Sequence, residues 1–134
     1  MSKEFKLSAE KARQVAEIAL KGIECGKSRF GESFTESLLE ILSEYITDYS
    51  KVGKFEVGVS VPYYSFRNKA KDRFSSSEVS EDELEGLFDS IIGEVKSLVE
   101  SQGFVVSVEF TGSTASERIF NGNDTYGAKF DISW

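Results

Sequence analysis

The side chains that could do chemistry in this chain are carboxylates, hydroxyls, amines and one thiol, because histidine is absent from all 134 residues and Cys25 is the only cysteine. Histidine is the side chain that titrates between pH 5 and 8, and it is the usual base beside a serine or cysteine nucleophile. One thiol without an imidazole also cannot supply the nitrogen and sulfur ligands of an ordinary zinc site. The residue types therefore argue against most catalysis near neutral pH and against a zinc centre.

Three short motifs resemble chemical sites but lack residues that those sites need. Gly26-Lys27-Ser28 is similar to the end of a phosphate-binding loop, but Lys21 stands where the first glycine of that loop belongs. Asn121-Gly122-Asn123-Asp124 offers oxygen ligands without the glycine and glutamate that an EF-hand calcium loop requires further on. Cys25 is expected near a helix C-terminus, where the helix dipole raises the pKa of a thiol and disfavours a nucleophile. We therefore expect no catalytic residue, no cofactor and no metal site.

The segment from Tyr63 to Phe74 interleaves aromatic with basic side chains. Its members include the ring of Phe66 and the cations Arg67, Lys69, Lys71 and Arg73. Cations beside stackable rings are typical of single-stranded nucleic-acid binding. Two other interpretations fit the pattern: the cations face the acidic residues 78–85 of a second subunit, or the segment is a solvated loop. We take Phe66 and the four cations as candidate partner contacts.

Acidic residues recur at four-residue intervals in the second predicted helix. They are Glu36, Glu40, Glu44 and Asp48, here called the acidic ridge. Like charges at this spacing repel each other by a few tenths of a kcal/mol per pair. The acidic ridge fits a docking site for a basic protein, or a nucleic-acid mimic that competes with DNA for a basic target. A solvated helix face has the same pattern.

Small residues share the back of the third predicted helix, opposite its apolar stripe. They are Gly86, Ser90, Gly93 and Ser97, here called the small-residue seam. Glycine inside a helix costs about 0.5–1 kcal/mol relative to alanine. That cost without a benefit to the core indicates that another helix or strand approaches the seam closely. The alternative is that the seam is a solvent-exposed helix face of low stability that no other element contacts.

The connection from Gly112 to Thr125 is long for a hairpin and rich in hydroxyl and amide side chains. Loops longer than about 12 residues in compact domains are usually functional or disordered. Within this loop, Arg118, Ile119 and Phe120 form a short charged and apolar group before the Asn121-Gly122 turn. We expect these three side chains to contact a partner.

Three helices and three strands are predicted to position these side chains. The first helix is expected to start at the N-cap Ser8 and to end at Gly26, and the second to run from Ser33 to Tyr49. The third is expected to run from Ser80 to a glycine stop at Gly103. The first helix has Ala12, Val15, Ala16, Ala19 and Ile23 at helical spacing. Alternating apolar residues predict strands over 55–61, 104–111 and 126–134. Residues 63–79 fit more than one type of structure.

The resulting order is α-α-β-α-β-β, which predicts a single compact α+β domain over residues 1–134. A right-handed crossover through the third helix makes the first two strands parallel. We therefore expect a three-stranded, mostly antiparallel sheet of order 1-3-2, packed against the helices, with the C-terminal strand in its centre. This mixture of elements resembles that of small phage tail and neck assembly proteins, a likeness of fold class that implies an assembly subunit.

The net charge of −7 is unevenly spread, with +3 over residues 64–77 and −7 over residues 78–100. The acidic balance disfavours long-range attraction to nucleic acid, although a local anion site is compatible with it. Hydrophobic residues make up 40% of the chain, which indicates a packed core, and no apolar run is long enough to span a membrane. With charges near Met1 where a signal peptide needs an apolar run, we expect a cytoplasmic protein.

These features predict a non-enzymatic protein-interaction domain, either an assembly subunit or an inhibitor or modulator of a larger complex. Its expected partner is another protein, a second copy of the chain, or both. Single-stranded nucleic-acid binding through residues 63–74 and nucleic-acid mimicry by the acidic ridge are the alternatives. A carboxylate-based enzyme comes last, because 23 acidic residues single out no catalytic pair.

Overall fold

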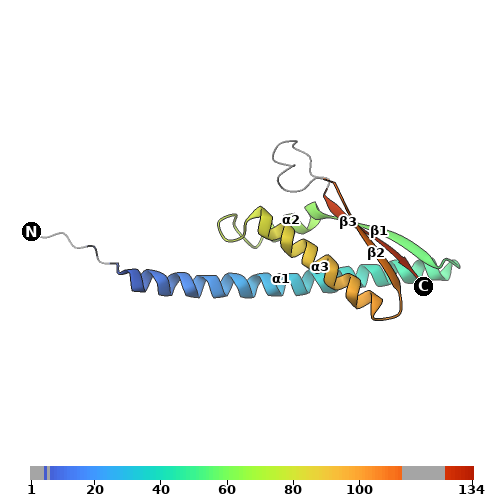
Figure 1. Ribbon diagram of the computed structural model, residues 1–134, viewed down its shortest axis with the longest axis horizontal. Helices are drawn as coiled ribbons and strands as arrows, with labels where there is room; N and C mark the ends of the chain where they lie inside the picture. Colours follow the sequence, from blue (N-terminus) through green and yellow to red (C-terminus); the bar gives the residue numbers. More distant parts are fainter. Residues whose placement is uncertain (1–4, 6, 113–125) are drawn as a thin grey trace, which may run out of the picture.

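Helices and an antiparallel sheet make up the part of the chain that the structure describes, residues 5, 7–112 and 126–134 of a computed structural model (Figure 1). In chain order the elements are α1 (Ala9–Lys51), β1 (Glu56–Pro62), α2 (Tyr63–Lys71), α3 (Glu81–Glu100), β2 (Val105–Thr111) and β3 (Gly127–Ser133). The separate helices and sheet confirm the predicted α+β class.

The sheet has the predicted order β1-β3-β2, with β3 antiparallel to both neighbours. One row across it joins Val57, Ile132 and Val106, and all three side chains are buried. Because side chains alternate between the two faces of a strand, the next row, Gly58, Asp131 and Ser107, is exposed. At one end of β3, a Cβ on Gly127 would lie 2.8 Å from the carbonyl oxygen of Val61, so the two strands approach too closely there for a side chain.

The N-terminal part of the chain is one helix, so the prediction of two helices separated near Gly26 is wrong. α1 runs for 43 residues, about 64 Å at 1.5 Å per residue, and includes Gly26, Gly31 and Ser33. A Cβ on Gly26 would lie 3.2 Å from the ring of Phe74, and one on Gly31 would touch Leu87 and Ile91. Gly26 therefore leaves room for the Phe74 ring, whereas at Gly31 a Cβ would fit at ordinary contact distance and only a larger side chain would displace Leu87 and Ile91. The order of elements becomes α-β-α-α-β-β.

The undecided segment 63–79 begins with the helix α2. Pro62 precedes its first residue, and the buried Tyr63, Phe66 and Ala70 recur at helical spacing. The predicted cap of α3 is confirmed, because the Ser80 side chain accepts a hydrogen bond from the Glu83 backbone.

The predicted glycine stop after α3 is also confirmed. Gly103 has a positive φ of 94°, which glycine adopts without strain.

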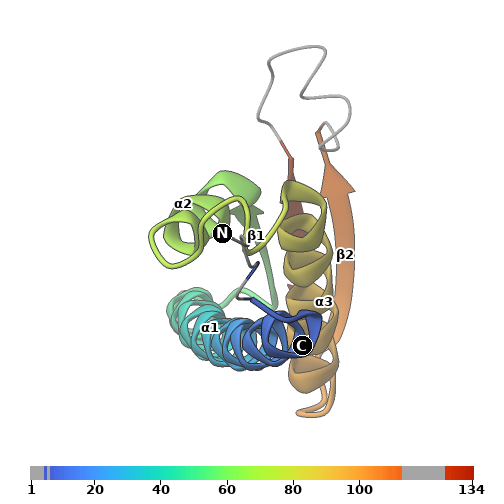
Figure 2. The same cartoon turned by 90° about the vertical axis from the view of Figure 1, so that its left-hand side faces the viewer.

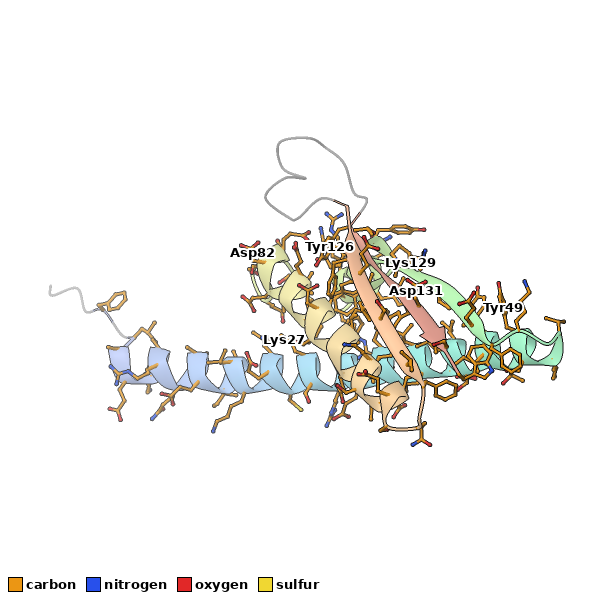
Figure 3. All side chains as sticks on the ribbon, turned by 45° about the vertical axis from the view of Figure 1, so that its right-hand side comes forward. Lys27, Tyr49, Asp82, Tyr126, Lys129 and Asp131 are labelled. Carbon is orange, nitrogen blue, oxygen red and sulfur yellow. The ribbon has the colours of Figure 1, made fainter. Side chains whose placement is uncertain are left out.

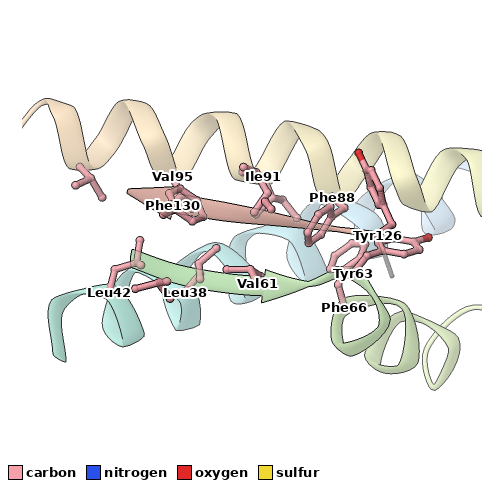
Figure 4. Close-up of a cluster of buried hydrophobic side chains, with 14 of the residues drawn as sticks. Leu38, Leu42, Val61, Tyr63, Phe66, Phe88, Ile91, Val95, Tyr126 and Phe130 are labelled. Carbon is pink, nitrogen blue, oxygen red and sulfur yellow. The ribbon is translucent and has the colours of Figure 1, made fainter. Parts of the chain in front are cut away.

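The core lies where α1 and α3 pack on the same face of the sheet (Figures 2 and 4). Leu38 and Leu42 of α1 meet the sheet beside Val61, and Ile91 and Val95 of α3 meet it beside Phe130 (Figure 4). At the end of the core near α2, aromatic rings pack with centroids 5.0–6.1 Å apart, namely Phe30, Phe34, Tyr63, Phe66, Phe88 and Tyr126. α2 is thereby fixed against both long helices.

The first part of α1 extends past the rest of the molecule (Figure 1). All residues from Ala9 to Gly22 are exposed, and the first partly buried side chain is Ile23. We call Ala9–Gly22 the overhang. At 1.5 Å per residue it projects about 20 Å from the body of the fold.

The glycines of α1 allow a test of how the helix packs. We expect Gly31→Gln to destabilise the fold by about 1–3 kcal/mol, because the larger side chain has to displace Leu87 and Ile91. Gly22→Gln is the matched control in the same helix, since nothing lies within 4 Å of a Cβ there. Urea unfolding followed by circular dichroism measures both. Equal unfolding free energies for the two variants would contradict the packing of α1 on α3 at Gly31.

Candidate protein-interaction surfaces

Two of the four cations of the basic segment are bound within the chain. α2 carries Arg67 and Lys71 four residues apart, so both reach the start of α3. The Glu81 carboxylate accepts hydrogen bonds from Arg67 Nε at 2.8 Å, from Lys71 Nζ at 3.0 Å and from the Tyr63 hydroxyl at 3.3 Å. The basic segment thus faces the acidic block of its own chain at this carboxylate.

The charge of Glu81 depends on these partners. Burial raises its pKa, but the hydrogen bonds and charges of Lys71 and Arg67 outweigh burial, so the pKa falls below its usual value of 4.5. Glu81 is therefore ionised near neutral pH and joins α2 to α3.

The structure removes Phe66 from the candidate binding surface, because its ring is 0% exposed and packs against Phe30, Phe34 and Phe88. It is a core residue because α2 is a helix that turns this ring inward. The two remaining cations of the segment lie over aromatic rings of α1. Lys69 is 5.8 Å from the Phe34 ring centroid, and Arg73 is 5.9 Å from that of Phe30.

The small-residue seam lies exposed on α3, and part of it lines a groove between α3 and α1. Gly86 and Ser90 face Ser28 and Gly31 across this groove, which has a volume of about 560 Å³. A Cβ on Gly86 or Gly93 would meet nothing within 4 Å, so no element of the described structure fills the space beside the seam. The groove rim carries Glu24, Glu32, Glu83 and Glu94.

Lys27 is the basic residue of the groove rim, and its role is structural (Figure 3). Its ammonium group lies 2.9 Å from Glu24 and 3.4 Å from Glu83, so it joins α1 to the first turn of α3. The hydrogen bond to Glu24 is the main cause of its raised pKa; burial opposes the shift, and Glu83 adds to it. Gly26-Lys27-Ser28 lies inside α1, where no phosphate-binding loop can form.

Cys25 lies within the same turn of α1 as Lys27 and is exposed. The expectation that it sits at a helix C-terminus is therefore wrong, because α1 continues to Lys51. In residues 5, 7–112 and 126–134, no three acidic or cysteine side chains gather as a metal site would require. Glu78 and Glu81 both have lowered pKa values, whereas a general acid needs a raised one.

The acidic ridge is exposed along α1, and all four of its carboxylates face solvent. The hollow on the open face of the sheet is also polar, with Lys129 and Asp131 pointing away from the helices (Figure 3). Arg118, Ile119 and Phe120, predicted to contact a partner, lie outside the described residues.

Sequence reasoning did not identify the overhang as a surface. It exposes large apolar side chains, with Val15 67%, Ile18 73% and Leu20 57% exposed. Figure 3 shows these turns of α1 with no other element beside them. The apolar pattern of the overhang was visible in the sequence, but its exposure depends on where the body of the fold ends.

No protein-family model matches the chain, and neither a curated protein nor a solved structure was found to be similar to it. Across the residues that the structure describes, the helices are too short or too polar to cross a bilayer.

The Glu81 contacts predict a pH dependence of stability. Because the folded pKa is lowered, this stabilisation is complete above the usual pKa of 4.5 and is lost as the pH falls through the folded value. We expect Glu81→Gln to lower the unfolding free energy at pH 7 by about 0.5–1 kcal/mol, a modest loss because the side chain is 39% exposed. The difference from wild type should shrink towards pH 3.

Asp82→Asn is the matched control, because Asp82 shares the first turn of α3 and is exposed. Both variants lose the same favourable interaction with the helix dipole. Equal losses in the two variants at pH 7 would show that Arg67 and Lys71 add nothing to the stability of the fold.

Proposed function

We propose that this chain is a non-enzymatic protein-interaction domain, an assembly subunit or a modulator of a larger complex, that binds its partner through the overhang of α1. The observation that carries the proposal is the exposure of Val15 and Leu20, with the exposed Ala16 and Ala19 between them, on a helix that leaves the body of the fold. Full burial of an aliphatic side chain of this size contributes roughly 1.5–3 kcal/mol. A partner bound on the Ala16 side of the helix would gain part of that for Val15 and for Leu20.

Helix energetics support the same proposal. A helical segment of 14 residues has little stability of its own in water, because most helical stability in proteins comes from tertiary packing, and the overhang has none. The overhang also has Gly22 at its base, which costs about 1 kcal/mol of helix stability relative to alanine. A partner that covers the overhang would offset this cost. In the isolated chain, no contact of the overhang with the body of the fold offsets it.

The acidic ridge supports nucleic-acid mimicry as a second candidate, because Glu36, Glu40, Glu44 and Asp48 are all exposed on one helix. Binding of single-stranded nucleic acid has less support. Phe66 is buried, and Arg67 and Lys71 already share a carboxylate, so the rings and cations are not free together.

Ala16→Arg tests the proposed function, because Ala16 lies on the apolar side of the overhang. We expect it to reduce protein capture from extracts of the native cell at least tenfold, counting untagged copies of the chain among the captured proteins, since an interface of this kind cannot bury an unpaired cation. Gln14→Arg adds the same charge on the polar side and should capture as wild type does. Equal capture by all three proteins, measured by quantitative mass spectrometry, would refute binding through the overhang.

A further inference from the structure

β2 is an edge strand whose outer side is unpaired. It is the last strand in the sheet order β1-β3-β2, and β3 pairs with its inner side from Val105 to Thr111 without a bulge. In an antiparallel sheet, every second residue of an edge strand points its backbone N–H and C=O away from the sheet. Among the described residues no strand pairs with these groups, and Figure 2 shows β2 at the outer side of the molecule. β2 therefore offers hydrogen-bonding groups to a further strand.

The other edge strand, β1, is protected in ways that β2 is not. Natural sheets protect exposed edges with proline, with charged side chains or with a covering helix. β1 ends in Pro62, and its three valines, which face the helices, are at most 7% exposed. β2 has no proline or glycine, and its only charged side chain is Glu109, which lies opposite Lys129 of β3. β2 thus lacks the features that keep an edge strand from pairing.

The face of β2 that packs against the helices, here called its helix side, is covered only at its start. α3 leads into β2 through Gly103, and Val106 is 7% exposed there. Exposure increases along the strand: Val108 is half-buried, and Phe110 is 45% exposed although its ring stacks on that of Tyr126 with centroids 6.1 Å apart. The apolar layer of the core therefore continues past the helices at the end of β2.

These two features together indicate a second copy of the chain as the occupant of the edge. A separate extended peptide would pair with the backbone of β2, but a single strand brings no second layer to cover Phe110. A second copy, paired antiparallel about a two-fold axis at Val108, places the partner's Val106 with its helix cover directly opposite Phe110. Every directly opposed pair on the helix side is then apolar, which stabilises strand pairing.

The open face of the sheet fits the same register. Ser107 lies opposite the partner's Glu109, and Val105 lies opposite the partner's Thr111, so no like charges face each other directly. A register shifted by two residues in one direction would place Glu109 opposite its own copy, where the two carboxylates repel. A shift by two residues in the other direction would move Phe110 beyond the end of the partner strand. The register centred on Val108 avoids both costs.

We propose that two copies of this chain associate through β2 as an antiparallel strand pair, which forms a continuous sheet of six strands, three from each copy. The two-fold axis passes through the sheet at Val108, so the helices of both copies lie on the same face. This surface is separate from the overhang, and the inference goes beyond the proposed function. Because only one seven-residue strand of each copy pairs, the interface is of the small, reversible kind, with a Kd on the order of 10–100 μM.

Sedimentation equilibrium between 10 μM and 1 mM measures the association, and wild type should form dimers over this range. Ser107→Glu places a carboxylate opposite the partner's Glu109 at two sites of the pair and should raise the Kd about tenfold. Ser107→Lys places a cation at the same sites and should lower the Kd severalfold. Ser60→Glu is the matched control, because it adds the same charge to the open face of β1, and it should dimerise as wild type does.

A wild type that is monomeric at every concentration overturns the inference. An equal Kd in all four proteins also overturns it, because that association would not use β2. Ala16→Arg should dimerise as wild type does. A pair with this Kd is dissociated in a dilute extract, so the capture experiment on the overhang does not depend on it. Failure of self-association therefore leaves the proposed function standing, and failure of capture leaves the strand pair standing.

Cysteine pairing tests the register. In a Cys25→Ser background, Ser107→Cys and Glu109→Cys chains are mixed in equal amounts and oxidised in a glutathione buffer, and the disulfide-linked dimers are identified by mass. The proposed register predicts that nearly all of them join residue 107 to residue 109. A register shifted by two residues would give one symmetric product, and random collision would give the mixed product in half of the dimers. Either of these results overturns the pairing at Val108.

Discussion

The close packing of α1 at Gly26 and Gly31 is the constraint on which the rest of the structure depends. At Gly26 the helix has no side chain, so the Phe74 ring can lie against its backbone, and at Gly31 the side chains of Leu87 and Ile91 lie at contact distance from the position of a Cβ. Those contacts fix α2 and α3 relative to α1, and the helices together cover one face of a thin sheet. Gly26 costs the helix about 1 kcal/mol relative to alanine, and the approach of the Phe74 ring that it permits offsets that cost.

The same constraint divides the charged and apolar surfaces into two groups. Residues near the packed half of α1 are bound within the chain: Lys27 joins α1 to α3, and Glu81 collects Arg67, Lys71 and the Tyr63 hydroxyl. Residues of the overhang have no such neighbours, so Val15, Ile18 and Leu20 remain exposed. The acidic charge of the chain would not oppose the proposed association at this surface, because the overhang carries Lys11, Arg13 and Lys21 against Glu10 and Glu17. The proposed recognition at this surface would therefore depend mainly on apolar shape.

The sequence predicts the fold class and the strand order correctly, because the relevant signals are local. Ser80 caps α3 and Gly103 ends it, and alternating valines form β1. The predicted helix end at Gly26 is wrong because the sequence does not distinguish a glycine that ends a helix from one inside a helix that packs against an aromatic ring. The ring that packs there belongs to Phe74, 48 residues further along the chain. The interaction surfaces are less predictable for a related reason. The spacing of Phe66 and the neighbouring cations fits an extended segment as well as a helix. The exposure of Val15 depends on how much of α1 the rest of the fold covers, which the sequence of α1 does not show.

Continuity of α1 is the central claim, and a distance between spin labels measures it directly. In a Cys25→Ser background, labels at Lys11→Cys and Thr47→Cys lie on the outer side of α1, 36 residues apart. Doubly labelled protein diluted into unlabelled protein reports the distance within one chain. One continuous helix predicts a mean distance of about 54 Å. A mean below about 30 Å would mean that the chain turns back between Gly26 and Ser33, so that the overhang packs against its own body and leaves no free surface for a partner.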